Sequence, residues 1–372
     1  MSFSNTIYLS TNVSCNLNCI YCYEDKSSKE TFDIEIAKER ISKFLDKPTE
    51  KGTLIDLHGG EPFMVFDKIK ELCEWLWCQN SKEKFLVYCT TNGTLVHGEI
   101  KKWLNANKHR FCCGLSFDGN RNMQNANRSN SFDKIDLDFF LNTWPSQGIK
   151  MTISPKSINE LADGVIFLHR KGVKEIHANL AEMVYWPKEL KSVYRRELEK
   201  LADYYLKHQD VDPCTLFKVP FFKIGKAGNV DKWCGVGTMN AYDIIGDKKY
   251  PCHLFFESVC GKDKSEQCFS IDFNDPHVYV STECNNCPFL AICPTCYGSN
   301  YIARGDIGKR DMDICEFQKI RFSVVANFEY QKIMHSLSHI DDFEEEEKRK
   351  MLLKIEGIMK ITTELNKIEL DE

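Results

Sequence analysis

The chain has 372 residues, 42% of them hydrophobic, which is enough for one large barrel-type domain and a smaller one. Its formal net charge is -5, so we expect no nucleic-acid partner, since such a partner needs an excess of clustered Lys and Arg. No run of about 18 uncharged apolar residues occurs, and the N-terminus lacks the pattern of a secretion signal. We therefore expect a cytoplasmic protein with no membrane partner.

The 18 cysteines are the outlying feature of the composition. Disulfides fit poorly with a chain that shows no secretion signal, because the cytosol keeps thiols reduced. Metal sites are the favoured interpretation. Six cysteines fall inside expected elements or alone in loops, and we interpret them as thiols without a function: Cys73, Cys78, Cys89, Cys112, Cys113 and Cys214.

Short apolar runs alternate with longer amphipathic stretches in the first 180 residues, which is typical of strand–helix units. The amphipathic stretches place apolar residues at i, i+3, i+4 and i+7. Six such units predict a parallel α/β fold, a partial (β/α)6 TIM-like barrel with functional loops at the carboxyl ends of its strands. The expected strands are 6–10, 54–57, 85–90, 114–117, 150–153 and 175–178.

Beyond the barrel, the texture of the sequence changes twice. It becomes cysteine-rich and irregular near Asp212 and helical again after Cys315. We expect three parts: a barrel over 1–208, a cysteine-rich domain over 209–317 and a helical tail over 318–372. The tail contains an acidic block and an apolar stripe, which predict a helix that packs on the protein or binds a partner.

The first motif of chemical interest is CxxxCxxC, formed by Cys15, Cys19 and Cys22 directly after the first expected strand. Three thiolates at this spacing can each bind one iron of a [4Fe-4S] cluster, leaving the fourth iron without a protein ligand. A zinc knuckle and buried structural thiols are the alternatives. With Tyr21, the motif resembles the signature of the radical S-adenosylmethionine (SAM) superfamily. The resemblance implies that SAM binds the open iron and is cleaved to a 5′-deoxyadenosyl radical that abstracts a substrate hydrogen.

Further segments resemble motifs of the same superfamily, in the expected order along the barrel. Gly59, Gly60, Glu61 and Pro62 resemble its GGEP motif, and Glu61 would then accept a hydrogen bond from the SAM ammonium group. Thr91, Asn92 and Gly93 resemble its TNG motif. The remaining SAM contacts that the resemblance implies are Tyr21, Ser116 and Asp118, Arg128 toward the SAM carboxylate, and Leu180 toward adenine.

A second cysteine region contains CxxCxxxxxCxxC, with one cysteine after it and two before it. Structural zinc would account for four of these seven cysteines, but not for all of them. The arrangement resembles the SPASM domain, which holds two auxiliary [4Fe-4S] clusters, so that we expect three clusters in all. The resemblance implies an outer cluster on Cys284, Cys287, Cys293 and Cys315 and an inner cluster on Cys234, Cys252 and Cys296.

This region departs from the family pattern at several places. The last gap of the core holds two residues instead of three, and the gap from Gly246 to Cys252 is one residue longer than usual. No eighth cysteine stands near Asn240, so the inner cluster either has an open iron that could bind a substrate thiolate or is completed by Cys260 or Cys268. His253 replaces the Asp that serves sulfatase-maturing relatives as a base, which favours a different reaction, although His can also act as a base.

Together these motifs predict a radical SAM peptide maturase that forms a thioether or carbon–carbon cross-link in a ribosomally synthesised peptide. An anaerobic sulfatase-maturing enzyme and a non-catalytic iron–sulfur electron carrier are the alternatives. The expected partners are a peptide or protein substrate and an electron donor such as flavodoxin or ferredoxin. Because the chain begins almost at the first strand, we expect leader recognition at the barrel mouth, at the C-terminal tail or by a separate leader-binding protein.

Overall fold

The structure is a computed structural model that describes residues 3–224, 232–243, 248–336 and 343–371. The chain divides into two compact units, each built from two segments. Unit 1 comprises Met1–Met151 and Cys234–Asp275, and unit 2 comprises Thr152–Trp233 and Pro276–Glu372. These units group residues by contact. The three-part division into barrel, cysteine-rich domain and tail stays a prediction.

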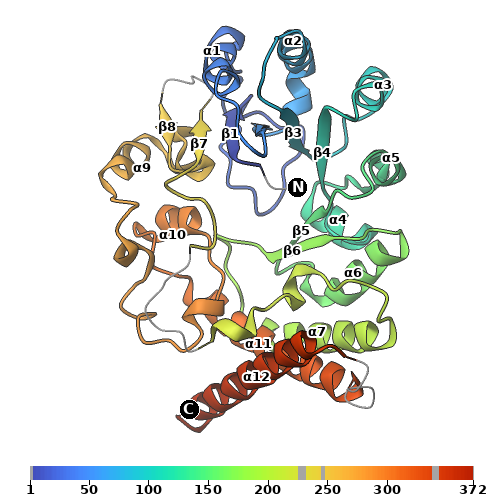
Figure 1. Ribbon diagram of the computed structural model, residues 1–372, viewed down its shortest axis with the longest axis vertical. Coiled ribbons are helices and arrows are strands. Elements are labelled where there is room, and N and C mark those ends of the chain that lie inside the picture. The colour runs from blue at the N-terminus through green and yellow to red at the C-terminus, as the bar shows by residue number, and fades with distance from the viewer. Residues whose placement is uncertain (1–2, 225–231, 244–247, 337–342, 372) are drawn as a thin grey trace. The chain divides into compact units, whose positions relative to one another are not determined.

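Unit 1 is built on a mainly parallel sheet (Figure 1). Its strands lie in the order β5-β4-β3-β2-β1-β7-β8, and only β8 runs antiparallel to its neighbour. The last two residues of β5 belong to unit 2. The strands are β1 (Asn5–Ser10), β2 (Thr53–His58), β3 (Phe85–Thr91), β4 (Phe111–Ser116), β5 (Ile149–Ile153), β7 (Asn240–Tyr242) and β8 (Lys249–Tyr250).

The two faces of this sheet differ in chemistry because side chains alternate along each strand. One face contributes apolar residues such as Ile7, Ile55 and Val87 to the core. The opposite face carries polar side chains, and the strand register places Asp56 between Tyr8 and Tyr88.

The helical elements of unit 1 are α1 (Ile34–Leu45), η1 (Pro62–Val65), α2 (Phe66–Trp77), α3 (Gly98–Ala106), α4 (Arg121–Asn127), η2 (Phe132–Lys134), α5 (Leu137–Thr143), η6 (His253–Phe255), α8 (Glu257–Cys260), α9 (Lys262–Gln267) and η7 (Cys268–Ser270).

Unit 2 contains one whole strand and several helices. Phe317 of α11 packs against Trp186 and Tyr194, with ring centroids 5.0 and 5.5 Å apart. Its elements are η3 (Ile158–Glu160), α6 (Leu161–Arg170), β6 (Ile176–Leu180), α7 (Leu190–Lys207), η4 (Thr215–Phe217), η5 (Phe221–Lys223), η8 (Pro276–Tyr279), η9 (Leu290–Ile292), α10 (Tyr297–Arg304), α11 (Met312–Ser336) and α12 (Glu345–Asp371).

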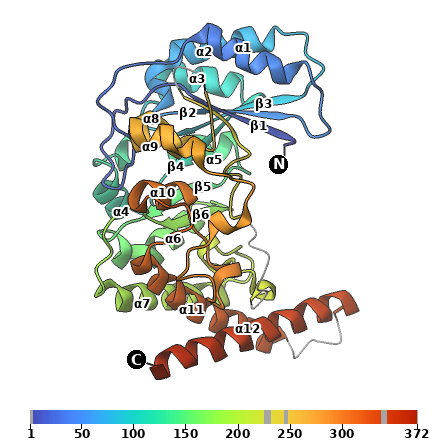
Figure 2. The same cartoon turned by 90° about the vertical axis from the view of Figure 1, so that its left-hand side faces the viewer.

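The C-terminal helix α12 crosses α11 (Figure 2). Its backbone approaches η5 so closely that a Cβ atom on Gly357 would lie 2.5 Å from the Phe221 carbonyl oxygen. Ile358 and Ile361 are buried, whereas Met359 is 65% exposed. The tail is therefore a helix packed on its own unit, with part of its apolar stripe left exposed.

All six strands predicted from the sequence are present. β4 begins three residues before the expected range because Phe111 and Cys113 continue its buried alternation. β7 and β8 were not predicted. Part of the acidic block and Gly246 lie outside the described residues. None of the helices in the described part of the chain combines the length and apolar character that a membrane crossing requires.

Candidate active site

The loop that follows β1 carries the first three cysteines, all with free thiols. The backbone N–H of Leu17 donates to Cys15 Sγ at 3.4 Å, and that of Cys22 donates to the Cys19 carbonyl at 3.1 Å. Burial raises the pKa of the Cys15 and Cys19 thiols. Because a metal ligand must be a thiolate, a bound metal has to supply the stabilisation that this environment lacks.

The GGEP segment holds the cysteine loop from one side. Gly60 N–H donates to the Asn12 carbonyl at 2.9 Å, and Glu61 N–H donates to the Ser14 carbonyl at 3.0 Å. A Cβ atom on Gly60 would lie 2.2 Å from the Ser14 carbonyl oxygen, and one on Gly59 would lie 2.4 Å from that of Asn12. Glycine is required at both positions because the two backbones are in direct contact.

The end of α4 and the residues after it hold the other side of the loop. Ile20 N–H donates to the Asn127 carbonyl at 3.0 Å, and Asn18 N–H donates to Ser129 Oγ at 2.9 Å. The cysteine loop is thus fixed at both of its flanks by backbone hydrogen bonds. This fixation requires no ligand, so the three thiols lie on a preformed loop.

Glu61 connects the loops that follow β2 and β3. It precedes Pro62, the first residue of η1, and its carboxylate accepts from Phe63 N–H at 3.2 Å. The same carboxylate accepts from Thr91 Oγ1 and from Asn92 N–H, both at 2.8 Å. Burial raises the pKa of Glu61 to about 7, although these three hydrogen bonds oppose the shift. Its role toward the SAM ammonium group stays a prediction.

Asn92 joins this carboxylate to the cysteine loop. Its side-chain amide donates to Asn16 Oδ1 at 3.0 Å and lies 3.8 Å from Cys15 Sγ. The structure therefore brings together residues from three predicted motifs, the cysteine loop, GGEP and TNG, at the carboxyl ends of β1, β2 and β3.

A buried ion pair lies after β4, which ends at Ser116. Asp118 Oδ1 accepts from Arg128 Nη2 at 3.1 Å, and Oδ2 lies 3.0 Å from Arg128 Nε. The Tyr21 hydroxyl donates to the same carboxylate, as does Asn127 Nδ2 at 3.0 Å. Burial alone would lower the pKa of Arg128, but Asp118 raises it above its usual range. Arg128, Asp118 and Tyr21, all predicted to contact SAM, thus contact one another. Ser116 is half-buried at the end of its strand.

Two histidines meet on the polar face of the unit 1 sheet. The rings of His58, from the end of β2, and His253, from η6, lie 4.4 Å apart between centroids. Burial lowers the pKa of both, to about 4 for His253, so both imidazoles are neutral at pH 7. Among the described residues, His58 Nε2, His253 Nδ1 and Asp56 Oδ1 are buried without a hydrogen-bond partner. Sequence reasoning missed Asp56 and His58, although polar residues at alternating positions of a strand were a signal for them.

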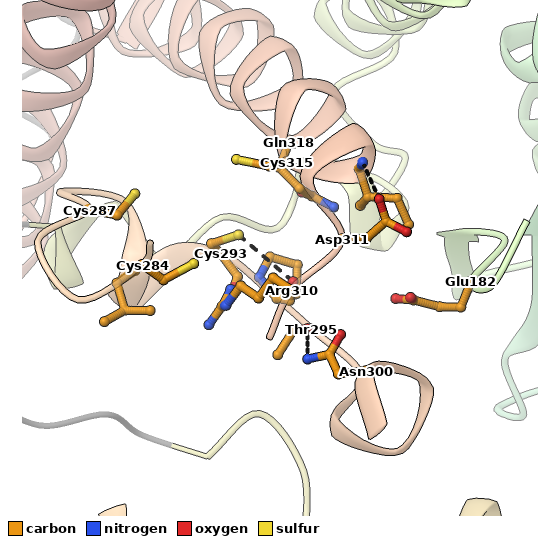
Figure 3. Close-up of a pocket in the computed structure, with 13 residues that line it drawn as sticks. Glu182, Cys284, Cys287, Cys293, Thr295, Asn300, Arg310, Asp311, Cys315 and Gln318 are labelled. Atoms are coloured by element: carbon orange, nitrogen blue, oxygen red, sulfur yellow. Dashed lines mark hydrogen bonds between the residues drawn. The ribbon is translucent and has the colours of Figure 1, made fainter. Parts of the chain in front are cut away.

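The second cysteine region forms a pocket within unit 2 (Figure 3). The pocket encloses about 470 Å³ of space between atoms, part of it open to solvent. All four cysteines expected to hold the outer cluster line it: Cys284, Cys287, Cys293 and Cys315. Arg310 also lines the pocket, and its Nη1 donates to the Cys293 carbonyl. Sequence reasoning did not single out Arg310.

The inner set of expected ligands is divided between the units. Cys234 and Cys252 belong to unit 1, whereas Cys296 caps α10 in unit 2. The two cysteines that could complete this set donate to backbone carbonyls of unit 1, Cys260 to Phe255 at 3.4 Å and Cys268 to Ser265 at 3.0 Å. Leu180, expected near adenine, is buried at the end of β6 in unit 2.

In the part of the chain that the structure describes, no three His, Cys, Asp or Glu side chains converge closely enough to hold a single metal ion. A tetrahedral zinc site would need four donors around one ion. A four-iron cluster takes each thiolate at a different iron, so its ligands are spread around a larger group. The four thiols around the unit 2 pocket and the three on the loop after β1 match the number of protein ligands that a closed and an open four-iron cluster take.

The sequence model of the Radical SAM superfamily matches residues 9–136, which include the three-cysteine loop, the GGEP segment, Asp118 and Arg128. The chain carries a radical SAM domain. Enzymes of this superfamily use SAM and a [4Fe-4S] cluster, so these are the cofactors of the domain.

Two relatives of known role share parts of this sequence. A cysteine-type anaerobic sulfatase-maturating enzyme of Clostridium perfringens is 30% identical over 139 residues, 34% of this chain and 35% of the relative. The subtilosin biosynthesis protein AlbA of Bacillus subtilis is 23% identical over 306 residues, 76% of this chain and 65% of the relative. The matched regions thus span between about a third and two thirds of these relatives.

Two solved structures share the fold at low sequence identity. The structure of anSMEcpe with bound AdoMet has a TM-score of 0.66 at 17% identity, covering 95% of this chain and 98% of that chain. SuiB of Streptococcus suis bound to its precursor peptide SuiA has a TM-score of 0.54 at 17% identity, covering 84% of this chain and 76% of that chain. The predicted α/β fold of a radical SAM enzyme with a cysteine-rich C-terminal region is confirmed.

Proposed function

We propose that this radical SAM enzyme is a peptide maturase, which abstracts hydrogen from a peptide side chain or backbone and forms a thioether or carbon–carbon cross-link in a ribosomally synthesised peptide. The observation that carries the proposal is the four-cysteine pocket of unit 2, which accompanies the radical SAM domain as a second cluster site. Peptide-bound structures of the same fold, those of anSMEcpe and SuiB, support a peptide as the substrate class.

The chain's own residues have distinct tasks in this proposal. Cys15, Cys19 and Cys22 would hold the cluster, which supplies the electron for SAM cleavage when bound. Glu61 would accept from the SAM ammonium group, for which a carboxylate is the matching acceptor. Asn92 and Ser116 stand at the carboxyl ends of their strands, where a barrel binds its ligands. The Asp118–Arg128 ion pair and the hydrogen bond from Tyr21 to Asp118 would hold the loop after β4 against the cysteine loop.

His253 and His58 support an acid–base role on the polar face of the sheet. A neutral imidazole can accept a proton, and both rings are neutral at pH 7, although the pKa values that burial lowers make them weaker bases than exposed histidines. Loss of a proton from a substrate thiol or carbon would require such an acceptor within hydrogen-bond reach. We assign His253 this role because its Nδ1 is buried without a partner among the described residues.

A sulfatase maturase remains the second candidate, because the Clostridium perfringens enzyme is 30% identical over 139 residues. His253, where that class carries Asp, counts against it. Product mass separates the two reactions. Cross-linking removes two hydrogens and ties two residues together, whereas formylglycine formation changes one Cys or Ser.

The experiment uses the full chain, reconstituted anaerobically, with SAM and dithionite. We expect 5′-deoxyadenosine to form, and about twelve irons if three [4Fe-4S] clusters assemble. Replacing Cys15, Cys19 and Cys22 by Ala should abolish SAM cleavage and leave the other clusters in place. With intact clusters, no 5′-deoxyadenosine would identify an iron–sulfur electron carrier instead. About four irons would contradict the auxiliary clusters.

The substrate test uses short reading frames beside the gene as candidate peptides, with flavodoxin or ferredoxin as the electron donor. A separate leader-binding protein and a cytoplasmic, low-oxygen setting belong to the same proposal. A peptide that loses two hydrogens and gains a link between two residues would support it. A single Cys or Ser converted to formylglycine would support the second candidate.

A further inference from the structure

Arg310 is a buried cation in the four-cysteine pocket, with only 6% of its surface exposed. A guanidinium has five N–H donors. Nη1 donates to the Cys293 carbonyl, but Nε and Nη2 are buried and have no hydrogen-bond partner among the described residues. Buried donors without an acceptor cost about 1–3 kcal/mol each, more when the group is charged. An acceptor is therefore missing beside this side chain.

The other charged groups that line the pocket do not supply that acceptor. Asp311 pairs with Arg304 at 3.2 Å, and its Oδ1 accepts from Asp313 N–H at 2.9 Å. Glu182 lies on the opposite side of the pocket (Figure 3), and burial raises its pKa to about 7, so its negative charge is only partly developed near neutral pH. Three uncharged polar side chains also line the pocket, and the side-chain oxygen of each accepts from another donor: Thr295 from Asn300, Asn300 from Arg304 and Gln318 from Arg321. Arg310 is the cation of this pocket.

An iron–sulfur cluster with four thiolate ligands is an anion, with sulfide and thiolate sulfurs that accept hydrogen bonds. We propose that Arg310 positions and tunes the outer cluster, with its Nε–H and Nη2–H donating to sulfur atoms of the cluster or its ligands. The proposal rests on the proposed function, because it takes Cys284, Cys287, Cys293 and Cys315 as the cluster's ligands. Arg310 is a positioning residue and does not contact the peptide substrate.

Reduction adds one negative charge to the cluster, and a nearby buried cation stabilises the reduced form more than the oxidised form. Hydrogen bonds to the sulfurs act in the same direction. Arg310 therefore raises the midpoint potential of the outer cluster and makes it a better electron acceptor.

The test compares Arg310→Met, Arg310→Lys and Lys218→Met in the full, anaerobically reconstituted chain. Midpoint potentials come from a redox titration followed by electron paramagnetic resonance, and iron is counted in each sample. We expect Arg310→Met to lower the potential of one cluster by at least ~59 mV, a tenfold change for one electron, without moving the others. Arg310→Lys keeps the charge and should give a smaller fall. Lys218→Met removes a cation that pairs with Asp212 at 2.8 Å and does not line the pocket, so it should leave every potential unchanged.

Full iron content in Arg310→Met with unchanged potentials would overturn the proposal. If Arg310→Met loses about four irons, the potential is measured on Arg310→Lys instead. An unchanged potential in Arg310→Lys would then overturn the proposal. Cys284→Ala and Cys315→Ala test the outer-cluster assignment separately from the role of Arg310. If both variants keep all their iron, the outer-cluster assignment itself is wrong. If each loses iron while the Arg310 variants show no shift, only the role of Arg310 is wrong.

Discussion

Gly60→Ala tests whether the contact between the GGEP segment and the cysteine loop holds the active site together. The added Cβ would lie 2.2 Å from the Ser14 carbonyl oxygen and 2.5 Å from that of Val13. Both are backbone atoms, so relief requires the two loops to separate. Separation breaks the Gly60–Asn12 and Glu61–Ser14 hydrogen bonds, at about 1 kcal/mol each, and overpacking adds about 1–3 kcal/mol. The expected loss is about 3–5 kcal/mol.

The assay is urea unfolding of the reconstituted protein, with iron content and SAM affinity measured on the same samples. Gly98→Ala is the matched control in unit 1, because Gly98 has a φ of 51° but no atom within 4 Å of an added Cβ. The free energy of unfolding of the control should fall only by roughly 1–2 kcal/mol, which is the cost of a left-handed backbone conformation for alanine. The control should keep its iron and its SAM affinity. Equal unfolding midpoints, iron content and SAM affinity in the two variants would refute the reasoning.

Three further substitutions test the electrostatics of unit 1. Asp56→Asn should flatten the pH dependence of the free energy of unfolding. Burial raises the pKa of Asp56 in the folded protein from 3.8 to about 6. The protonated carboxyl therefore contributes its full stabilisation below about pH 4, and this stabilisation is lost as the pH rises through about 6. The variant should then be more stable above pH 6, by up to about 3 kcal/mol in urea unfolding, and an unchanged pH profile would contradict this. Asp118→Asn leaves the buried Arg128 without its counter-charge and should cost about 3–5 kcal/mol by the same assay; a loss below 1 kcal/mol would show that the pair is not essential. Glu61→Gln should weaken SAM binding in equilibrium dialysis while iron content stays at the wild-type value, and unchanged affinity would remove Glu61 from the SAM site.

Much of the fold could be predicted from the sequence because its signals are local. Each of β1 to β6 is a run of five to seven residues with its own pattern of burial. β7 and β8 have three and two residues, too few to show any periodicity. They form because β1 has an unpaired edge. Pairing between segments far apart in the sequence produces no residue pattern in either segment alone.

The candidate site was predictable where the spacing of ligand residues in the sequence indicates a cluster site, as for the cysteines that line one pocket of unit 2. Side chains whose roles depend on their partners were not predictable. The ion pair between Arg128 and Asp118 was not predicted, and the expected contact of Arg128 with SAM stays a prediction. His58 and Arg310 draw attention only because folding leaves their polar atoms buried without partners. That property belongs to the three-dimensional arrangement and has no counterpart in a motif.

The pairing of β1 with β7 also sets an order of events during synthesis. Asn240 Nδ2 donates to the Thr6 carbonyl across 234 positions of the chain. At about 5–20 residues per second, a ribosome needs about 10–50 s to deliver the second strand after the first. The loop with Cys15, Cys19 and Cys22 is therefore outside the ribosome long before its sheet is complete. The strand that carries this loop therefore pairs with β7 only after residues 240–242 have been made.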